Sequence, residues 1–415
     1  MPRYPAGHQG DPLGFKANAF PVWWSEENST VRIVDLTTHV MHDGYRNLVF
    51  VRVHTDEGIT GLGEATLLNR TAAVVAYLQE HVKPQIVGRE PAMGGWLWRE
   101  MYSGGFIRGG IVGTTGLSAV ATALLDIEGK RLGVPAWRLL GGAVHERVPV
   151  YANAWYTVER EPSAIAERAL VVLGMGYRAL KIDPFGPGSF ELSPVEERRS
   201  LDILRAVRGA IGPDVELFVE GHGRFSTGQA TRMVRALEEV QAGWFEEPTS
   251  WDDPAAWLEV RRASAGRVPV AGGEHFNTRF GFRDALAGRW VDIIQPDVGY
   301  CGGPVELTHI AAMADAFGIV VALHDSSGPV STAASLHSAV TIPNLKMMEL
   351  FDDFSAPFVR EAVPGHPVAH DGYIELPTAP GLGVDLDLDV IAAHPFQPFA
   401  WNLYEEGWER RFAQP

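Results

Sequence analysis

The chain has 415 residues, 46% of them hydrophobic and 21% charged, which is typical of a globular protein with an ample core. Its formal net charge of −16 disfavours a nucleic acid or an anionic membrane as partner, because both are bound through clustered Lys and Arg. Cys301 is the only cysteine, which excludes an intrachain disulfide and a thiolate metal cluster. The sequence shows no apolar leader, and no stretch that approaches the ~20 apolar residues of a membrane span, so we expect a cytoplasmic protein.

The first part of the chain predicts an arm and a small α+β domain. We predict an N-terminal arm over residues 1–30, packed through Trp23 and Trp24, and a capping domain over 31–147. Alternating and β-branched residues predict three strands of an antiparallel sheet. These strands are expected at 31–40, 47–55 and 59–65.

Helical periodicity follows the predicted sheet. Apolar residues recur at helical spacing over 71–88 and again over 113–133. Gly133 stands where a glycine ends a helix.

From residue 148 the pattern changes to short apolar strands separated by amphipathic stretches of helix length, as in repeated βα units. Eight strands are expected, at 148–152, 178–182, 216–220, 243–246, 268–273, 291–295, 319–324 and 346–350. Eight such units close a barrel of about 250 residues. The predicted fold is therefore α/β: a (β/α)-barrel over 148–370, with the α+β capping domain completed by a returning C-terminal segment over 371–415.

Ionisable residues follow seven consecutive strands at their carboxyl ends, the face on which barrel enzymes build their active sites. They are Lys181 and Asp183, Glu220 and His222, Glu246 and Glu247, Glu274 and His275, Asp297, His324 and Asp325, and Glu349. Any one of them alone is as well explained by a solvated loop charge or a helix cap. The whole series predicts a site above the barrel axis.

Three glutamates end successive strands and are expected to converge on a metal ion. Glu220, Glu246 and Glu274 are spaced by one βα unit each. Carboxylate oxygens suit a hard cation, so the sequence predicts a Mg²⁺ site, with Mn²⁺ as the alternative.

Strand alternation sorts the other strand-end residues. Residues two apart share a side of a strand, so His222 is expected beside Glu220, and Asp183 beside Lys181. By the same rule the side chains of Glu247, His275 and Asp325 are expected to point away from the centre.

Asp297 and His324 end neighbouring strands and are predicted to form a dyad. In such a pair the carboxylate holds the imidazole in one tautomer and makes it a competent base near neutral pH.

With these residues placed, the chain resembles the mandelate racemase and muconate lactonizing enzyme branch of the enolase superfamily. The resemblance covers nearly all of the sequence after the first ~30 residues. Its motifs are GITGLGEA at 58–65, ALLDIEGKRLGVPAWRLLGG at 123–142, FEEP at 245–248, GGE at 272–274, QPDVGYCGG at 295–303, ALHDSSGP at 322–329 and GLGVDLDLD at 381–389. It implies Mg²⁺ on the three glutamates, His324 paired with Asp297 in catalysis, a small sugar-acid substrate and a homo-oligomer.

Two departures from the racemase pattern narrow the expected reaction. The second barrel strand ends in Lys181-Ile182-Asp183, where racemases of this branch keep a second basic residue. VEGHGRF at 219–225 instead supplies His222, and this stretch is similar to that of the galactonate and mannonate dehydratases. Glu220 stands where the family more often has Asp.

These residues predict a sugar-acid dehydratase. His324 is assigned as the base that removes the α-proton, and His222 as the acid that releases water, giving a 2-keto-3-deoxy sugar acid. Lys181 and Glu349 are expected to contact the substrate carboxylate or the developing enolate. A cycloisomerase or epimerase acting through the same intermediate is the second hypothesis, and a barrel with only a binding role is the third.

Weaker substrate-binding candidates complete the set of predicted site residues. Arg224 either binds substrate or forms a salt bridge, and Asp183 is a further substrate-binding candidate. Tyr45, Arg46 and Arg108 lie in capping-domain loops that could contact distal hydroxyl groups or a second carboxylate, although packing and surface salt bridges account for them equally well.

Overall fold

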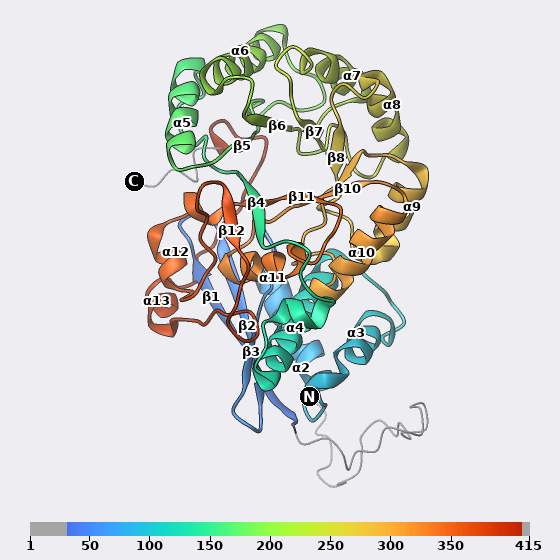
Figure 1. The fold of residues 1–415 in the computed structure, drawn as a ribbon, viewed down its shortest axis with the longest axis vertical. Helices are drawn as coiled ribbons and strands as arrows, with labels where there is room; N and C mark the ends of the chain where they lie inside the picture. Colours follow the sequence, from blue (N-terminus) through green and yellow to red (C-terminus); the bar gives the residue numbers. More distant parts are fainter. Residues whose placement is uncertain (1–30, 409–415) are drawn as a thin grey trace, which may run out of the picture.

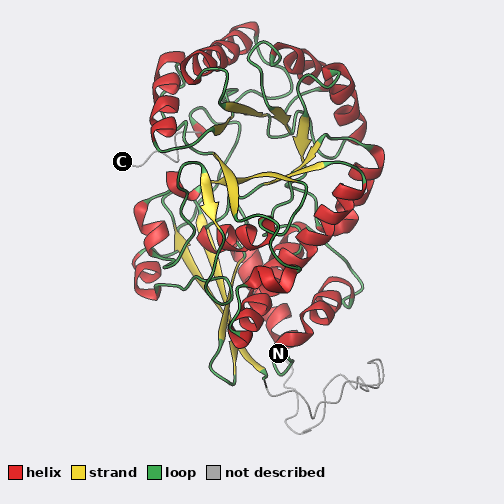
Figure 2. Cartoon of the chain, in the orientation of Figure 1, coloured by secondary structure: helices red, strands yellow, loops and turns green. Residues whose placement is uncertain are grey.

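A computed structural model describes residues 31–408 of the chain (Figure 1). A barrel with an outer ring of helices lies next to a smaller unit built on an antiparallel sheet, as Figure 2 shows. The predicted arm over 1–30, with Trp23 and Trp24, lies outside the described residues. The predicted fold class is confirmed.

The capping sheet has the order β1-β2-β3 and is antiparallel throughout. Its strands are β1 (Ile33–His42), β2 (Asn47–Thr55) and β3 (Thr60–Glu64). The helices of this unit are α1 (Thr71–Tyr77), a π-helical turn (Leu78–Val82), α2 (Lys83–Ile86), a 3₁₀ turn (Pro91–Met93), α3 (Gly94–Ser103) and α4 (Ile111–Leu132). The three predicted strands are correct to within two residues.

Helix α4 packs directly on β3, and glycine permits the close approach. A Cβ on Gly61 would lie 2.0 Å from the carbonyl oxygen of Ala123, and one on Gly63 would lie 2.0 Å from that of Ala119. Gly133, at φ 67°, ends the helix as predicted. The expectation that no stretch approaches a membrane span was wrong for α4, which is long and apolar enough by composition, but 72% of that window is buried as core.

Eight parallel strands form the barrel, which closes through pairing of β11 with β4. They are β4 (Arg147–Ala152), β5 (Ala179–Ile182), β6 (Glu216–Glu220), β7 (Trp244–Glu246), β8 (Val270–Gly272), β9 (Ile293–Ile294), β10 (Val320–Leu323) and β11 (Leu345–Leu350). Every predicted barrel strand overlaps one of these. Side chains from all eight strands fill the interior, with Tyr151, Phe218 and Trp244 the largest, so the barrel is a packed core rather than a pore.

The outer helices follow the strands in chain order (Figure 1). They are α5 (Pro162–Gly174), α6 (Pro194–Ile211), α7 (Thr227–Ala236), α8 (Pro254–Ser264), α9 (Thr278–Gly288), α10 (Pro304–Ala316) and α11 (Pro329–Ala339). Proline at the first turn of five of them suits the helix start, where its missing N–H has no intrahelical partner.

The C-terminal segment returns to the capping unit. After a 3₁₀ turn (Asp352–Phe354) and α12 (Pro357–Glu361), strand β12 (Tyr373–Glu375) pairs antiparallel with β4. Beyond it, the Leu382 N–H donates to Asp126 of α4, and short helix α13 (Leu388–Ala393) lies against β1. The segment therefore completes the capping domain.

Candidate active site

Three glutamates converge at the carboxyl ends of the barrel strands. Glu220 ends β6, Glu246 ends β7, and Glu274 lies two residues beyond β8. One carboxylate oxygen from each lies within 4.8 Å of the other two. Oxygen donors at that separation fit a six-coordinate Mg²⁺ or Mn²⁺ that keeps further positions for water and substrate.

Lys181 reaches into this carboxylate group from β5. Its Nζ lies 2.5 Å from Glu246 Oε1, 3.0 Å from Glu349 Oε1 and 3.4 Å from Glu220 Oε2. The side chain is 2% exposed. Burial would lower the pKa of Lys181, but Glu246 and Glu349 raise it well above its ordinary value. A charged ammonium therefore offsets part of the negative charge of the cluster.

The carboxylates differ in how readily they ionise. Burial raises the pKa of Glu220, and burial together with Glu220 raises that of Glu246 well above its ordinary value. For Glu274, burial acts in the same direction, but His324, His275 and Lys181 hold the pKa at about 2. Because these acids repel one another, a divalent cation bound between them would be stabilised by their combined negative charge.

His324 and Asp297 form the predicted pair. His324 Nδ1 lies 2.7 Å from Asp297 Oδ2, so the ring donates through Nδ1 and Nε2 is the nitrogen directed to the site. Nε2 lies 3.1 Å from Glu274 Oε2 and 3.7 Å from Glu349 Oε2. Burial would lower the pKa of His324, but Glu274, Glu349 and Asp297 raise it well above its ordinary value.

His222 lies on the opposite side of the glutamates from β10 and pairs with Asp183. His222 Nδ1 is 2.6 Å from Asp183 Oδ2, and the His222 N–H donates to Glu220 Oε1 at 2.6 Å. His222 has φ 48°, so its direction comes from a left-handed turn after β6 rather than from the strand alternation on which its placement was predicted. Burial lowers the pKa of this imidazole.

Arg224 holds Asp183 in position. Its Nη2 donates to the same Asp183 oxygen that His222 contacts, and its Nη1 and Nε donate to the carbonyls of Gly186 and Gly221. The arginine is 4% exposed. The geometry therefore matches the salt-bridge alternative for Arg224, and it places Asp183 between the Arg224 guanidinium and the His222 imidazole.

Three residues that were not singled out in the sequence hold the carboxylates in place. Asn153, just after β4, donates to Glu349 Oε1 at 2.6 Å, while Gln295 and Trp244 donate to Glu246 Oε2 at 2.6 and 2.9 Å. Asn153 and Gln295 both follow barrel strands at the carboxyl end. The strand-end rule would have found them if amides had been counted with the ionisable groups.

Glu247 and His275 lie beside the three glutamates rather than away from them. His275 Nε2 is 3.2 Å from Glu274 Oε1 and 3.4 Å from Glu247 Oε2. The expectation that Glu247 and His275 point away from the centre is therefore wrong. The Asp325 N–H donates to Glu349 Oε2 at 3.0 Å, while its buried carboxylate has no hydrogen-bond partner among the described residues. Left-handed Glu247, at φ 37°, breaks the alternation here too.

The capping domain contributes buried groups to this region. Arg46 is 5% exposed, and its Nη2 donates to the Ser327 carbonyl at 2.8 Å, beside the loop that follows β10. Tyr45 is also buried, whereas Arg108 lies exposed between α3 and α4. Glu64 accepts hydrogen bonds from the Gly328 and Ser331 N–H groups at 2.7 and 3.1 Å, which ties β3 to the start of α11.

Comparison with known proteins decides the family. A family described as the enolase C-terminal domain-like family matches residues 164–390, and the mandelate racemase / muconate lactonizing enzyme N-terminal domain matches residues 22–141. Together these matches span both structural units. The chain belongs to the enolase superfamily.

Several relatives of this superfamily member carry names of sugar-acid dehydratases. It is 33% identical to a D-galactonate dehydratase of Xanthomonas axonopodis pv. citri, over 90% of this chain and 96% of that protein. It is 33% identical to a D-gluconate dehydratase of Thermoproteus tenax, over 86% of this chain and 72% of the relative, and 31% identical to a D-mannonate dehydratase of Sphingomonas, over 88% and 95%.

Solved structures of the superfamily share the fold. A mandelate racemase/muconate lactonizing enzyme from Jannaschia superposes with a TM-score of 0.82 at 31% identity, covering 89% of this chain and 98% of that one. An enolase superfamily member from Salmonella Typhimurium also gives 0.82, at 29% identity, covering 88% and 98%. This chain is therefore an enzyme of the mandelate racemase branch.

In this enolase superfamily enzyme the C-terminal segment also reaches the site. The ring centroid of His222 lies 5.5 Å from that of Trp408 and 6.4 Å from that of Trp401. The Trp401 N–H and carbonyl are both hydrogen-bonded to the side chain of Asn69, in the loop after β3. Nothing in the local sequence marked these tryptophans, because their neighbours in space are more than 150 residues away in the chain.

Proposed function

We propose that the enzyme removes the α-proton of a sugar-acid carboxylate and then eliminates the β-hydroxyl group as water, giving a 2-keto-3-deoxy sugar acid. The observation that carries this proposal is the arrangement of two histidine–aspartate pairs around three metal-type carboxylates. The names of the dehydratase relatives support the same reaction class.

Glu220, Glu246 and Glu274 fit a divalent cation, and we assign them as its ligands. Bound there, Mg²⁺ would stabilise negative charge on the substrate carboxylate as the α-proton leaves. Lys181, already charged beside Glu246 and Glu349, is placed to stabilise the same developing charge. In this proposal Lys181 Nζ gives up contacts with Glu246 and Glu349 and contacts the substrate carboxylate instead.

His324 is the proposed base. Asp297 accepts the proton on Nδ1 and thereby fixes the tautomer in which Nε2 has the free lone pair. Once His324 is neutral, Nε2 takes the α-proton and the electron pair moves into the carboxylate. A cation held by Glu274 would offset part of the negative charge that raises the pKa of His324.

His222 is the proposed acid. Asp183 engages Nδ1, which leaves Nε2 to donate a proton to the departing β-hydroxyl. The C–O bond breaks as the electron pair returns from the carboxylate, water leaves, and the enol product tautomerises to the ketone. Arg224 holds Asp183 in position and is committed to that contact.

The test separates the two steps. Stereoisomeric aldonates and aldarates are incubated in D₂O with Mg²⁺, and both deuterium at the α-carbon and keto acid trapped by semicarbazide are measured. We expect His324→Asn to abolish both signals and His222→Asn to keep α-exchange while losing the keto acid. His366→Asn is the matched histidine control, because His366 lies on the loop after α12 and its ring contacts the Val363 carbonyl rather than a residue of the site.

The outcomes discriminate between reactions. Keto acid formation that survives His222→Asn would refute the acid assignment. α-Deuteration without keto acid from any substrate with wild-type enzyme would instead indicate an epimerase or cycloisomerase acting through the same proton abstraction. Absence of both signals from every sugar acid would point to a barrel with only a binding role.

A further inference from the structure

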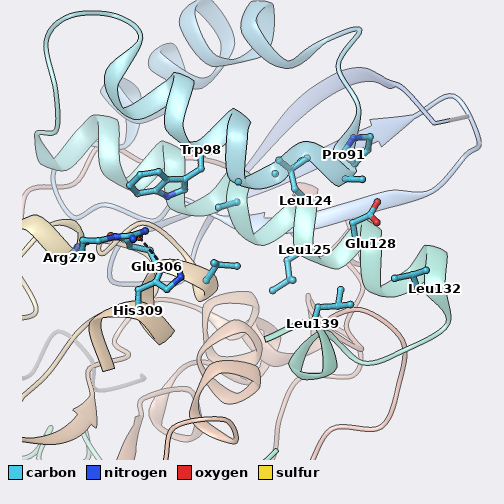
Figure 3. A pocket seen from close by; sticks show the side chains of 15 residues that line it. Pro91, Trp98, Leu124, Leu125, Glu128, Leu132, Leu139, Arg279, Glu306 and His309 are labelled. Carbon is cyan, nitrogen blue, oxygen red and sulfur yellow. Dashed lines mark hydrogen bonds and ion pairs between the residues drawn. The ribbon is translucent and has the colours of Figure 1, made fainter. Parts of the chain in front are cut away.

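An apolar cavity that is partly open to solvent lies between the capping domain and the outer helices of the barrel, and none of the three glutamates lines it. Its volume is about 370 Å³. One wall comes from α3, the 3₁₀ turn before it and α4, and the other from α9, α10 and the 3₁₀ turn at Ala136–Leu140. In Figure 3, Leu124 and Leu125 project between Trp98 on one side and Leu139 on the other.

The lining is mainly carbon. The charged residues of the lining have partners on the protein, since Arg279 is paired with Glu306 and Glu128 with Arg131, so they do not call for a charged ligand. An apolar cavity of about 150 Å³ accepts one benzene-sized ring, so this one has room for about two aromatic side chains. Exposing this apolar surface to water is unfavourable in free energy, which indicates that an apolar group occupies the cavity.

The start of the described chain lies next to this cavity. The Ile33 N–H donates to the Arg89 carbonyl at 2.9 Å, and the Gly88 N–H donates to the Ile33 carbonyl at 2.8 Å. Pro91, two residues after Arg89, is the first residue of the cavity wall. The first described strand therefore begins beside the cavity.

The chain that precedes this strand has the side chains the cavity needs. Residues 20–24 read Phe-Pro-Val-Trp-Trp. Trp24 is seven residues before Val31, a maximum span of about 24 Å, which reaches from the β1 end into a cavity that begins beside Arg89. No other segment outside the described residues combines this apolar content with this anchor point, since residues 409–415 read Glu-Arg-Arg-Phe-Ala-Gln-Pro.

We propose that the segment Phe20–Trp24 docks into this cavity of its own chain and fastens the capping domain to the barrel. Across this boundary, the described polar contacts include the bond from Trp98 Nε1 to the Gly302 carbonyl at 2.9 Å and that from the Gly302 N–H to Ser118 Oγ at 2.9 Å. An aromatic pair seated between α4 and α10 would add apolar contact to both domains at once. The proposal is independent of the reaction assigned to the barrel.

Disulfide trapping tests the docking directly. Cys301 is the only native cysteine and is buried, so two engineered cysteines report without interference. We pair Trp24→Cys with Leu139→Cys, which is 37% exposed on the cavity wall. The control pairs Trp24→Cys with Leu170→Cys, which is 50% exposed on α5 and outside the cavity lining.

The expected result is an intrachain disulfide in the cavity pair, formed at least about tenfold faster than in the control under mild oxidation. Mass spectrometry of peptides from the monomer band identifies the link. Equal rates in the two pairs would overturn the proposal, and so would a link found only between two chains, which would assign the cavity to the arm of a second copy.

A second measurement guards against a cysteine variant that alters the fold. Trp23→Ala/Trp24→Ala is compared with Phe15→Ala, which removes an aromatic side chain from the same arm outside the docking segment. We expect the double variant to lower the melting temperature by several degrees while kcat stays unchanged, and the control to lower neither. An unchanged melting temperature in the double variant would contradict docking.

Discussion

Replacing His337 by Gln should flatten the dependence of stability on pH. His337 lies in α11 with none of its surface exposed. The Trp137 N–H donates to its Nδ1 at 3.1 Å, so the neutral ring carries its proton on Nε2, which lies 3.2 Å from the Leu382 carbonyl. The ring thus joins the barrel to the 3₁₀ turn at Ala136–Leu140 and to the returning segment.

Protonation of this ring opposes folding. Burial, opposed only in part by the Leu382 carbonyl, lowers the pKa of His337 from 6.5 to about 4. Since the folded pKa is below the unfolded one, the stabilisation is complete above pH 6.5 and is lost as the pH falls toward 4. Proton linkage over this shift gives a loss of about 2.5 kcal/mol between about pH 8 and pH 4.5.

The assay compares urea unfolding of wild type and His337→Gln at both pH values. Gln can accept from Trp137 and donate to Leu382, but it does not titrate, so the carboxylate contributions common to both proteins cancel in the difference. We expect the wild type to lose about 2.5 kcal/mol more than the variant on acidification. If the difference in free energy of unfolding between wild type and variant changes by less than about 0.5 kcal/mol from pH 8 to pH 4.5, the lowered pKa of His337 is refuted.

Three further predictions concern the site and the fold. Asp297→Asn should slow α-proton exchange about 10²-fold or more, because the amide can donate to Nδ1 and turn the proton to Nε2; an unchanged exchange rate in D₂O would contradict the dyad. Mg²⁺ at about 100 times its Kd should raise the free energy of unfolding by about 2.7 kcal/mol relative to protein in EDTA. A melting temperature that is the same in Mg²⁺ and in EDTA would refute the predicted metal site. Gly61→Ala should lower the free energy of unfolding by several kcal/mol, because its Cβ would lie 2.0 Å from a backbone oxygen of α4. Gly209→Ala is the control: its Cβ in α6 would meet open space, so the change should be neutral or stabilising by calorimetry. Equal effects of the two changes would refute the close-packing argument.

Local periodicity was enough to predict the barrel. Strand period, helix length and the repeat of βα units are properties of neighbouring residues, and each of the eight predicted strands overlaps a strand of the structure. The order of the strands then places Glu220, Glu246 and Glu274 at the ends of three neighbouring strands, because parallel strands bring their carboxyl ends to the same face of the barrel. Convergence of the three carboxylates therefore needed no knowledge of long-range packing.

Beyond the strand ends, strand alternation no longer predicts where a side chain points. His222 and Glu247 both have positive φ, so their side chains follow turn geometry, which two-residue periodicity does not describe. His222 nevertheless meets Asp183, because Arg224 and the turn fix both partners in place. His222 does lie beside Glu220, as predicted, but through its backbone N–H, and its pairing with Asp183 was not predicted.

The sequence by itself determined the barrel, the three carboxylates and the pairing of His324 with Asp297, since each follows from residue spacing within successive βα units. Only the tertiary structure decided which cation contacts the glutamates, that Arg224 is committed to Asp183, and that Glu64 and Trp408 reach the barrel face from the capping domain and the C-terminal segment. Those contacts join residues up to hundreds of positions apart. Their geometry is set by how the two domains pack, which no local pattern encodes.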